Sequence, residues 1–169
     1  HRAIILRLVE VMLARYVTYN PPSQISMRLY HSVFMASKDL IYVTGDNREW
    51  ALNLRHIIPD SMLVMRPIRV NKSLCAVYAG NGHLFLLCGD GQLLATGSHP
   101  RYLQRKTSDE IAVVATDVIS VSLTAHCIMI IKSDGSLWAS GQNHDGVMGL
   151  GPDTDMARYL LIDNTHRLR

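Results

Sequence analysis

Apolar and polar residues follow one another in short runs along most of this chain, and the runs come in pairs that recur. The pairs occupy residues 31–45, 83–97 and 126–141. Each consists of a histidine, an apolar run, a turn that carries aspartate, a second apolar run and a glycine. The copies begin 52 and 43 residues apart. A strand pair that recurs at such an interval is typical of sheet-based repeat proteins, which usually act as binding surfaces.

Alternation and β-branched residues predict three strands in each copy. These lie near 24–28, 32–36 and 41–44 in the first copy, near 76–79, 84–87 and 93–96 in the second, and near 118–123, 127–131 and 137–140 in the third. The extended pieces 67–70 and 111–114 are candidates for a fourth strand. Four strands in about 40–50 residues make up one blade of a β-propeller.

Two of the predicted turns carry an Asp-Gly pair. Asp90-Gly91 and Asp134-Gly135 predict type I′ hairpin turns, which need a positive φ at both central residues. Lys38-Asp39 holds the same place in the first copy without a glycine, so we expect a different turn there. The turn itself explains why aspartate recurs at this position.

The repeated histidines His31, His83 and His126 each precede an aspartate by seven or eight positions. Each pair taken alone resembles an acid–base couple, but an active site is usually built once, whereas a structural device is built in every repeat. We therefore interpret the histidines as buried residues that tie the start of a strand to neighbouring backbone. A shared metal site is the alternative, although the spacing matches no common ligand set. We expect no catalytic residue, metal or cofactor.

Residues 137–151, LWASGQNHDGVMGLG, resemble the signature of the regulator-of-chromosome-condensation (RCC-type) repeat. That signature is a strand ending in aromatic-x-x-Gly, followed by x-Asn-x-x-Gly-x-Leu-Gly. Residues 40–54 match it less well, because Trp50 and Asn53 stand where the pattern has glycine, and residues 79–83 resemble its Gly-x-x-His segment. The resemblance covers roughly residues 24–151. It implies a seven-bladed propeller, of which this chain holds about three blades.

The resemblance also implies that glycine at the repeat positions serves backbone geometry or close packing of blades. The glycines to which we assign this structural role are Gly45, Gly91, Gly97, Gly135, Gly141, Gly146 and Gly149. Trp50 follows a loop, and it is either an exposed interface anchor or part of a blade junction.

The fold class that we predict is an all-β, partial RCC-type propeller preceded by an amphipathic helix. Residues 1–20 form the helix and a linker, 21–152 the blades, and 153–169 the start of a further repeat or a C-terminal tail. About three blades imply either a segment of a ring or an open arc whose edges are covered.

Composition narrows the partners and the compartment. A net charge of +3 over 169 residues, without a basic run, does not indicate nucleic acid. The cysteines Cys75, Cys88 and Cys127 form no C-x-x-C pair, which favours a reducing, intracellular compartment. No apolar run approaches the ~20 residues of a membrane span.

We therefore expect a non-catalytic, protein-binding or scaffolding propeller segment, whose partners are other subunits or the missing blades of the same protein. The alternative, implied by the family, is guanine-nucleotide exchange on a small GTPase such as Ran. An enzyme that uses the repeated histidines is a third possibility.

Overall fold

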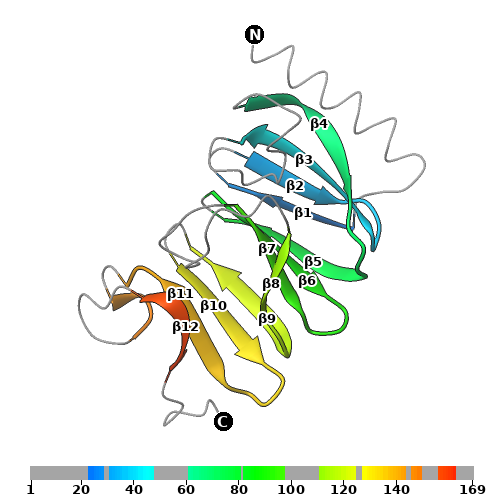
Figure 1. Ribbon diagram of the computed structural model, residues 1–169. Coiled ribbons are helices and arrows are strands. Elements are labelled where there is room, and N and C mark those ends of the chain that lie inside the picture. Colours follow the sequence, from blue (N-terminus) through cyan, green and yellow to red (C-terminus); the bar gives the residue numbers. More distant parts are fainter. Residues whose placement is uncertain are drawn as a thin grey trace.

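Three antiparallel sheets follow one another along the chain and fan out side by side in the computed structural model (Figure 1). The structure describes residues 23–28, 31–47, 61–80, 82–97, 111–124, 127–143, 146–149 and 156–162, with only the backbone described at 61–63 and 156–162. The predicted helix within residues 1–20, Trp50 and His126 lie outside these segments.

Each sheet contains four strands, which pair in chain order. The first sheet consists of β1 (Gln24–Met27), β2 (His31–Met35), β3 (Leu40–Asp46) and β4 (Ser61–Arg69). The second sheet consists of β5 (Leu74–Ala79), β6 (Leu84–Cys88), β7 (Leu93–Thr96) and β8 (Ala112–Ala115). The third sheet consists of β9 (Val118–Leu123), β10 (Cys127–Lys132), β11 (Leu137–Gly141) and β12 (Met156–Ile162).

The predicted all-β fold of propeller blades is confirmed. All nine predicted strands are present, with ends that differ by no more than two residues. The two candidates for a fourth strand correspond to β4 and β8.

Within the stretch 153–169, predicted as the start of a further repeat or a C-terminal tail, the structure describes residues 156–162. Within it, β12 pairs with β11, with Leu137 opposite Ile162, and completes the third sheet. The strand escaped prediction because its partner is decided by sheet pairing, and no hairpin turn in the sequence links it to β11.

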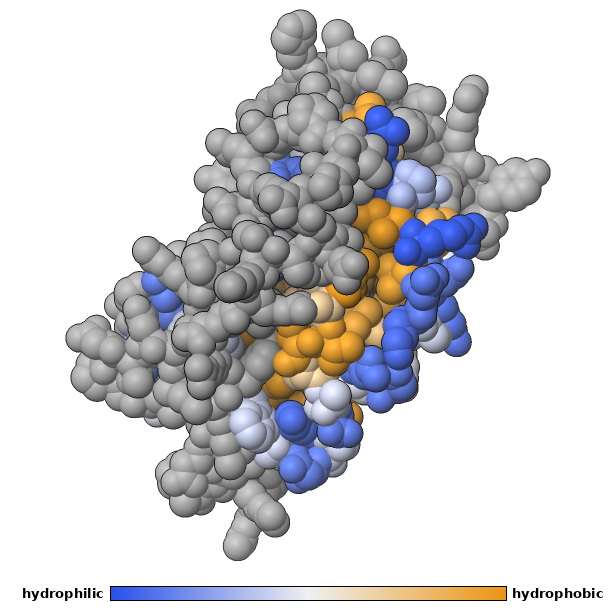
Figure 2. All heavy atoms as spheres, in the orientation of Figure 1, coloured by the Kyte–Doolittle hydropathy of each residue, from blue (hydrophilic) through white to orange (hydrophobic). Residues whose placement is uncertain are grey.

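The core consists of two apolar layers, one at each junction between sheets. Side chains alternate along β6, so Leu84 and Leu86 pack toward the first sheet, whereas Phe85 and Leu87 pack toward the third. Both faces of β6 are therefore buried, which explains why its sequence is a continuous apolar run. Figure 2 shows apolar residues gathered over the middle of the molecule, with hydrophilic residues along one border.

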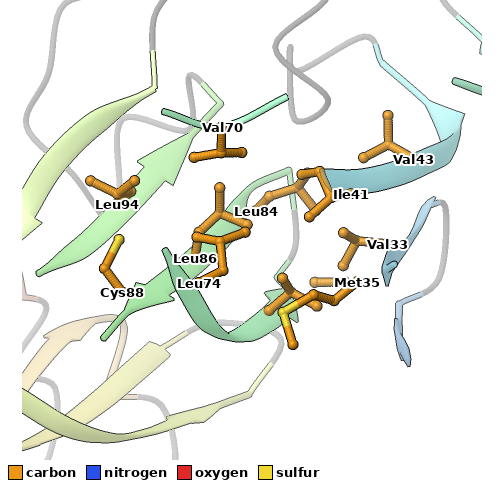
Figure 3. Packing of buried hydrophobic residues seen from close by; sticks show 12 residues of the cluster. Val33, Met35, Ile41, Val43, Val70, Leu74, Leu84, Leu86, Cys88 and Leu94 are labelled. Carbon is orange, nitrogen blue, oxygen red and sulfur yellow. The ribbon is translucent and has the colours of Figure 1, made fainter. Parts of the chain in front are cut away.

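Figure 3 shows the layer between the first two sheets. Val33 and Ile41 from the first sheet meet Leu84 and Leu86 from the second, and each of these side chains is nearly inaccessible to solvent. Complete burial of a leucine or isoleucine stabilises a fold by about 1.5–3 kcal/mol. The contact between neighbouring sheets therefore contributes much of the stability.

The Asp-Gly turns are not type I′. Gly91 and Gly135 have φ of 80° and 82°, but among the described residues other than glycine only Asp117 has a positive φ. The glycine N–H donates to the carbonyl three residues earlier, at 3.1 Å for Gly91 and 2.9 Å for Gly135. These loops contain three residues, in which a type I turn is followed by one left-handed glycine, so the aspartate keeps a negative φ. The first turn, at Lys38-Asp39, contains no residue of positive φ and differs as predicted.

Candidate functional site

The first repeated histidine links two sheets. The Nε2–H of His31 donates to the backbone carbonyl of His83, 3.2 Å away and 52 residues later. His31 is 4% exposed, and burial lowers the pKa of its imidazole although the same hydrogen bond and the nearby Asp46 oppose the shift. The ring therefore favours its neutral form, and its hydrogen bond joins the first sheet to the second.

His83 lies at the equivalent position of the second sheet and is 1% exposed. Its ring stacks on Phe85, with centroids 5.8 Å apart and planes inclined by 15°. Its carbonyl oxygen accepts hydrogen bonds from the His31 imidazole and from the Gly80 N–H. His83 thus lies within the packed junction and not in an open site.

The third equivalent position is held by Cys127 and not by His126. The backbone carbonyls of His31, His83 and Cys127 make the same hydrogen bond. Each accepts the backbone N–H of the residue three positions earlier, at 3.0, 2.8 and 2.9 Å respectively. The Asp-Gly turns likewise lie 44 residues apart, at 90 and 134. The interval between the second and third copies is therefore 44 residues and not 43, because structural equivalence follows the turn and the hydrogen bonds.

The glycines that end the hairpins share an unusual backbone conformation. Gly45, Gly97 and Gly141 have φ of 113°, 98° and 120°. A Cβ atom on Gly97 would overlap the carbonyl oxygen of Gly82. Glycine therefore lets two backbone segments meet at this point. Gly146 and Gly149, with φ of 67° and 71°, lie in the loop after β11.

The junction between the first and second sheets also depends on side chains of β1. The Gln24 Oε1 atom accepts the Val77 N–H at 2.7 Å, and the Ser26 Oγ atom accepts the Ala79 N–H at 2.9 Å. Two polar side chains of β1 thereby cover the free edge of β5. Ser122 of β9 is the counterpart of Ser26 after shifts of 52 and 44 residues, and it is exposed.

The outer face of the third sheet is buried at one end, where Cys127 and Ala139 pack with Met148, and exposed at the other. On the second sheet this face packs against the third, and Leu87 is 8% exposed. Ile131, the equivalent residue of the third sheet, is 39% exposed. The third sheet therefore presents a surface of the kind on which a neighbouring sheet packs in this same molecule.

A groove lies between the second and third sheets and has a volume of about 320 Å³. β8 and the residue after it form one wall, and β10 and β11 form the other. The described residues that line the groove are Val113, Val114, Ala115, Thr116, Ile130, Lys132 and Trp138.

The third hairpin turn holds the indole of Trp138 in place. The Nε1–H of Trp138 donates to the Ser136 Oγ atom at 2.7 Å, and the Ser136 hydroxyl donates to Asp134 at 2.6 Å. The hydroxyl and the backbone N–H of Ser136 both donate to Asp134 and lower its pKa, with a smaller contribution from the charge of Lys132. The Lys132 ammonium lies 4.8 Å from the centre of the Trp138 ring, at cation–π distance. The chain thus presents an ordered aromatic surface beside a positive charge.

The equivalent place between the first and second sheets is filled. There, Leu94 and Cys88 occupy the positions of Trp138 and Lys132, and both are buried with Val70 in one apolar cluster. The open groove is therefore built at only one of the two described junctions, whereas the strand-start histidine occurs in two sheets and the glycine that ends the hairpin in all three. By the criterion that a functional site is built once, the groove is the candidate site.

Neither wall residue is conspicuous in the sequence. Trp138 lies in a predicted strand, where packing in the core is its ordinary role, and Lys132 belongs to no motif. The available signal is the 44-residue alignment, which sets Trp138 against Leu94 and Lys132 against Cys88. Trp50, for which the sequence leaves open an interface anchor or a blade junction, lies outside the described residues.

The described segments contain no group of three or more His, Cys, Asp and Glu side chains placed to hold a metal ion. They also contain no helix long and apolar enough to cross a membrane.

The fold is similar to that of solved propellers. Human WBSCR16 matches with a TM-score of 0.68 and 16% identity over 85% of this chain and 40% of its own. Prp20p from Saccharomyces cerevisiae, described with its binding to Gsp1p and histones, matches with a TM-score of 0.64 and 16% identity over 87% of this chain and 40% of its own. Yeast RCC1 (Prp20) bound to Kap60 matches with a TM-score of 0.66 and 14% identity over 87% and 38% of the two chains.

These structures show that the chain has the fold of an RCC1-type β-propeller. It spans about two-fifths of the length of each of the three. Neither a protein-family model nor a curated protein sequence matches it.

Proposed function

We propose that this chain is a non-catalytic, protein-binding or scaffolding segment of a β-propeller within a larger assembly. The observation that carries the proposal is the outer face of the third sheet. Ile131, Ser120 and Ser122 are exposed there. The equivalent face of the second sheet packs against a neighbouring sheet.

The chemistry of the repeated polar residues supports a binding role. His31 bonds to backbone in the neighbouring sheet, and Asp90 and Asp134 bond to backbone within their own turns. The first contact joins two blades, and the other two stabilise hairpin turns. His31, Asp90 and Asp134 thus have structural partners, as the structural interpretation of the repeated residues expects.

Thiol labelling of the natural full-length protein that carries this sequence tests the proposal. Ile131→Cys, made in a Cys75→Ser background, should react at least about tenfold more slowly than Lys38→Cys at an exposed hairpin tip. Protection in the purified protein would indicate a further blade, and protection only in the native assembly would indicate a partner subunit. Equal labelling of both positions under both conditions would contradict the proposal.

A second candidate function is guanine-nucleotide exchange on a small GTPase such as Ran. The similarity of fold to Prp20p, which is described as binding Gsp1p, favours it. The test is the release of labelled GDP from Ran, with and without the full-length protein. An increase of at least about tenfold in the rate of GDP release would favour exchange. An unchanged rate would reject exchange on Ran and leave protein binding as the proposed function.

A further inference from the structure

We infer that the groove between the second and third sheets binds an extended peptide segment of a partner protein. The segment adds a strand to the free edge of β8 and directs an acidic side chain toward Lys132. This inference rests on the proposed binding function and names the chemistry of the partner for one site.

The backbone of β8 provides the first part of the argument. β8 is the last strand of the second sheet and pairs with β7, with Leu94 opposite Val113. No described strand pairs with its other edge, so that edge offers a row of N–H and C=O groups. Val113 is 49% exposed, and Figure 2 shows apolar residues over the part of the molecule where Figure 1 places β8. An extended peptide gains backbone hydrogen bonds when it joins such an edge.

The opposite wall of the groove provides specificity. Lys132 is the one charged side chain among the described residues that line the groove. Its ammonium lies over the Trp138 ring, and that ring is held by Ser136. A fixed indole is a typical anchor for an apolar side chain, because little rotamer entropy is lost on binding. A carboxylate one or two positions along the peptide would then meet the ammonium.

The other blade junction shows that the opening is not required by the fold. At the equivalent place Leu94 is 5% exposed and Cys88 3% exposed, and both pack against the first sheet. The same architecture therefore closes when leucine and cysteine stand at these two places. The indole and the ammonium keep the second junction open.

The probe is a capped nonapeptide in which valine and glutamate alternate, titrated into the full-length protein. We expect saturable binding and a shift of the Trp138 indole N–H resonance. A counterpart with lysine in place of glutamate should bind at least about tenfold more weakly, because its charge repels Lys132. N-methylation of alternate peptide nitrogens should abolish binding, because it removes the backbone donors.

Variants assign the binding to this groove. Trp138→Leu places the residue of the closed junction in the groove, and it should remove binding while the protein retains its cooperative melt. Lys132→Met should abolish the preference for glutamate over lysine. Lys72→Met is the matched control, because Lys72 pairs with Asp90 at 3.2 Å and does not line the groove.

Several outcomes would overturn the inference. They are absence of saturable binding, equal binding of the N-methylated peptide, and binding that survives Trp138→Leu. A concentration-dependent dimer that Trp138→Leu abolishes would instead make a second copy the occupant. If the peptide does not bind but Ile131→Cys is protected, this inference is rejected and the proposed function stands. If the peptide binds but Ile131→Cys reacts as fast as Lys38→Cys, the groove stands as a binding site and the outer face of the third sheet is rejected as an interface.

Discussion

Two glycines of the second and third repeats show how much the surroundings of a residue matter. Gly97 has a φ of 98° and lies against the carbonyl of Gly82, whereas Gly135 has a φ of 82° and no atom within 4 Å of the place where a Cβ would stand. Both positions disfavour a side chain on the grounds of backbone conformation, but only Gly97 also lacks the space for one.

We therefore predict unequal costs for alanine at these positions. Gly97→Ala should lower the free energy of unfolding by more than about 3 kcal/mol, because conformational strain and overlap with backbone add. Gly135→Ala should cost about 1–2 kcal/mol from the left-handed conformation alone. Chemical denaturation of the two variants measures the difference, and equal midpoints would show that the contact with Gly82 carries no energy.

His31 should make stability depend on pH. Burial lowers its pKa below the ordinary value of 6.5, so the unfolded chain takes up the proton more readily than the folded one. The contribution of the neutral imidazole is complete above pH 6.5, and it is lost as the pH falls from there through the folded pKa.

His31→Gln provides the test, since the glutamine amide can still donate to the His83 carbonyl. Denaturation midpoints at pH 7.5 and pH 5.5 should differ less in this variant than in the unmodified protein. An identical pH dependence in both would assign the effect to other groups.

At the scale of strands, the edge of β5 depends on side chains of β1. Ser26 accepts the Ala79 N–H, and Ala79 is 5% exposed. Ser26→Ala should therefore cost about 1–3 kcal/mol, because it leaves a buried N–H without its acceptor. Ser37→Ala is the control: the Ser37 hydroxyl bonds to exposed Asp39, so its loss should change stability little. Equal thermal midpoints of the two variants would contradict this role of β1.

At the scale of the whole molecule, the outer face of the third sheet leaves the apolar side chain of Ile131 exposed. Residues 1–169 alone should be poorly soluble or oligomeric, because Ile131 and its neighbours would meet water or another copy. Ile131→Glu should reduce this association in sedimentation velocity. Val64→Glu, at an exposed position of the first sheet, is the matched control. A stable monomer of the unmodified fragment would contradict the prediction.

The sequence by itself determined the strands, the hairpins and the blade-like repeat. These follow from local physics, since apolar runs of five residues end at Asp-Gly pairs, and glycine alone adopts the left-handed conformation at low cost. Both parts of that signal are present in the second and third copies, and the observed strands agree with them closely.

Only the tertiary structure decided which residues of different copies are equivalent. Cys127 and not His126 takes the place of His83, because backbone hydrogen bonds set the register of a sheet and chemical likeness does not. Pairing also made β12 the outer strand of the third sheet. The groove at Trp138 and Lys132 was likewise decided by the tertiary structure. It exists because two neighbouring sheets meet there with side chains that do not fill the space between them.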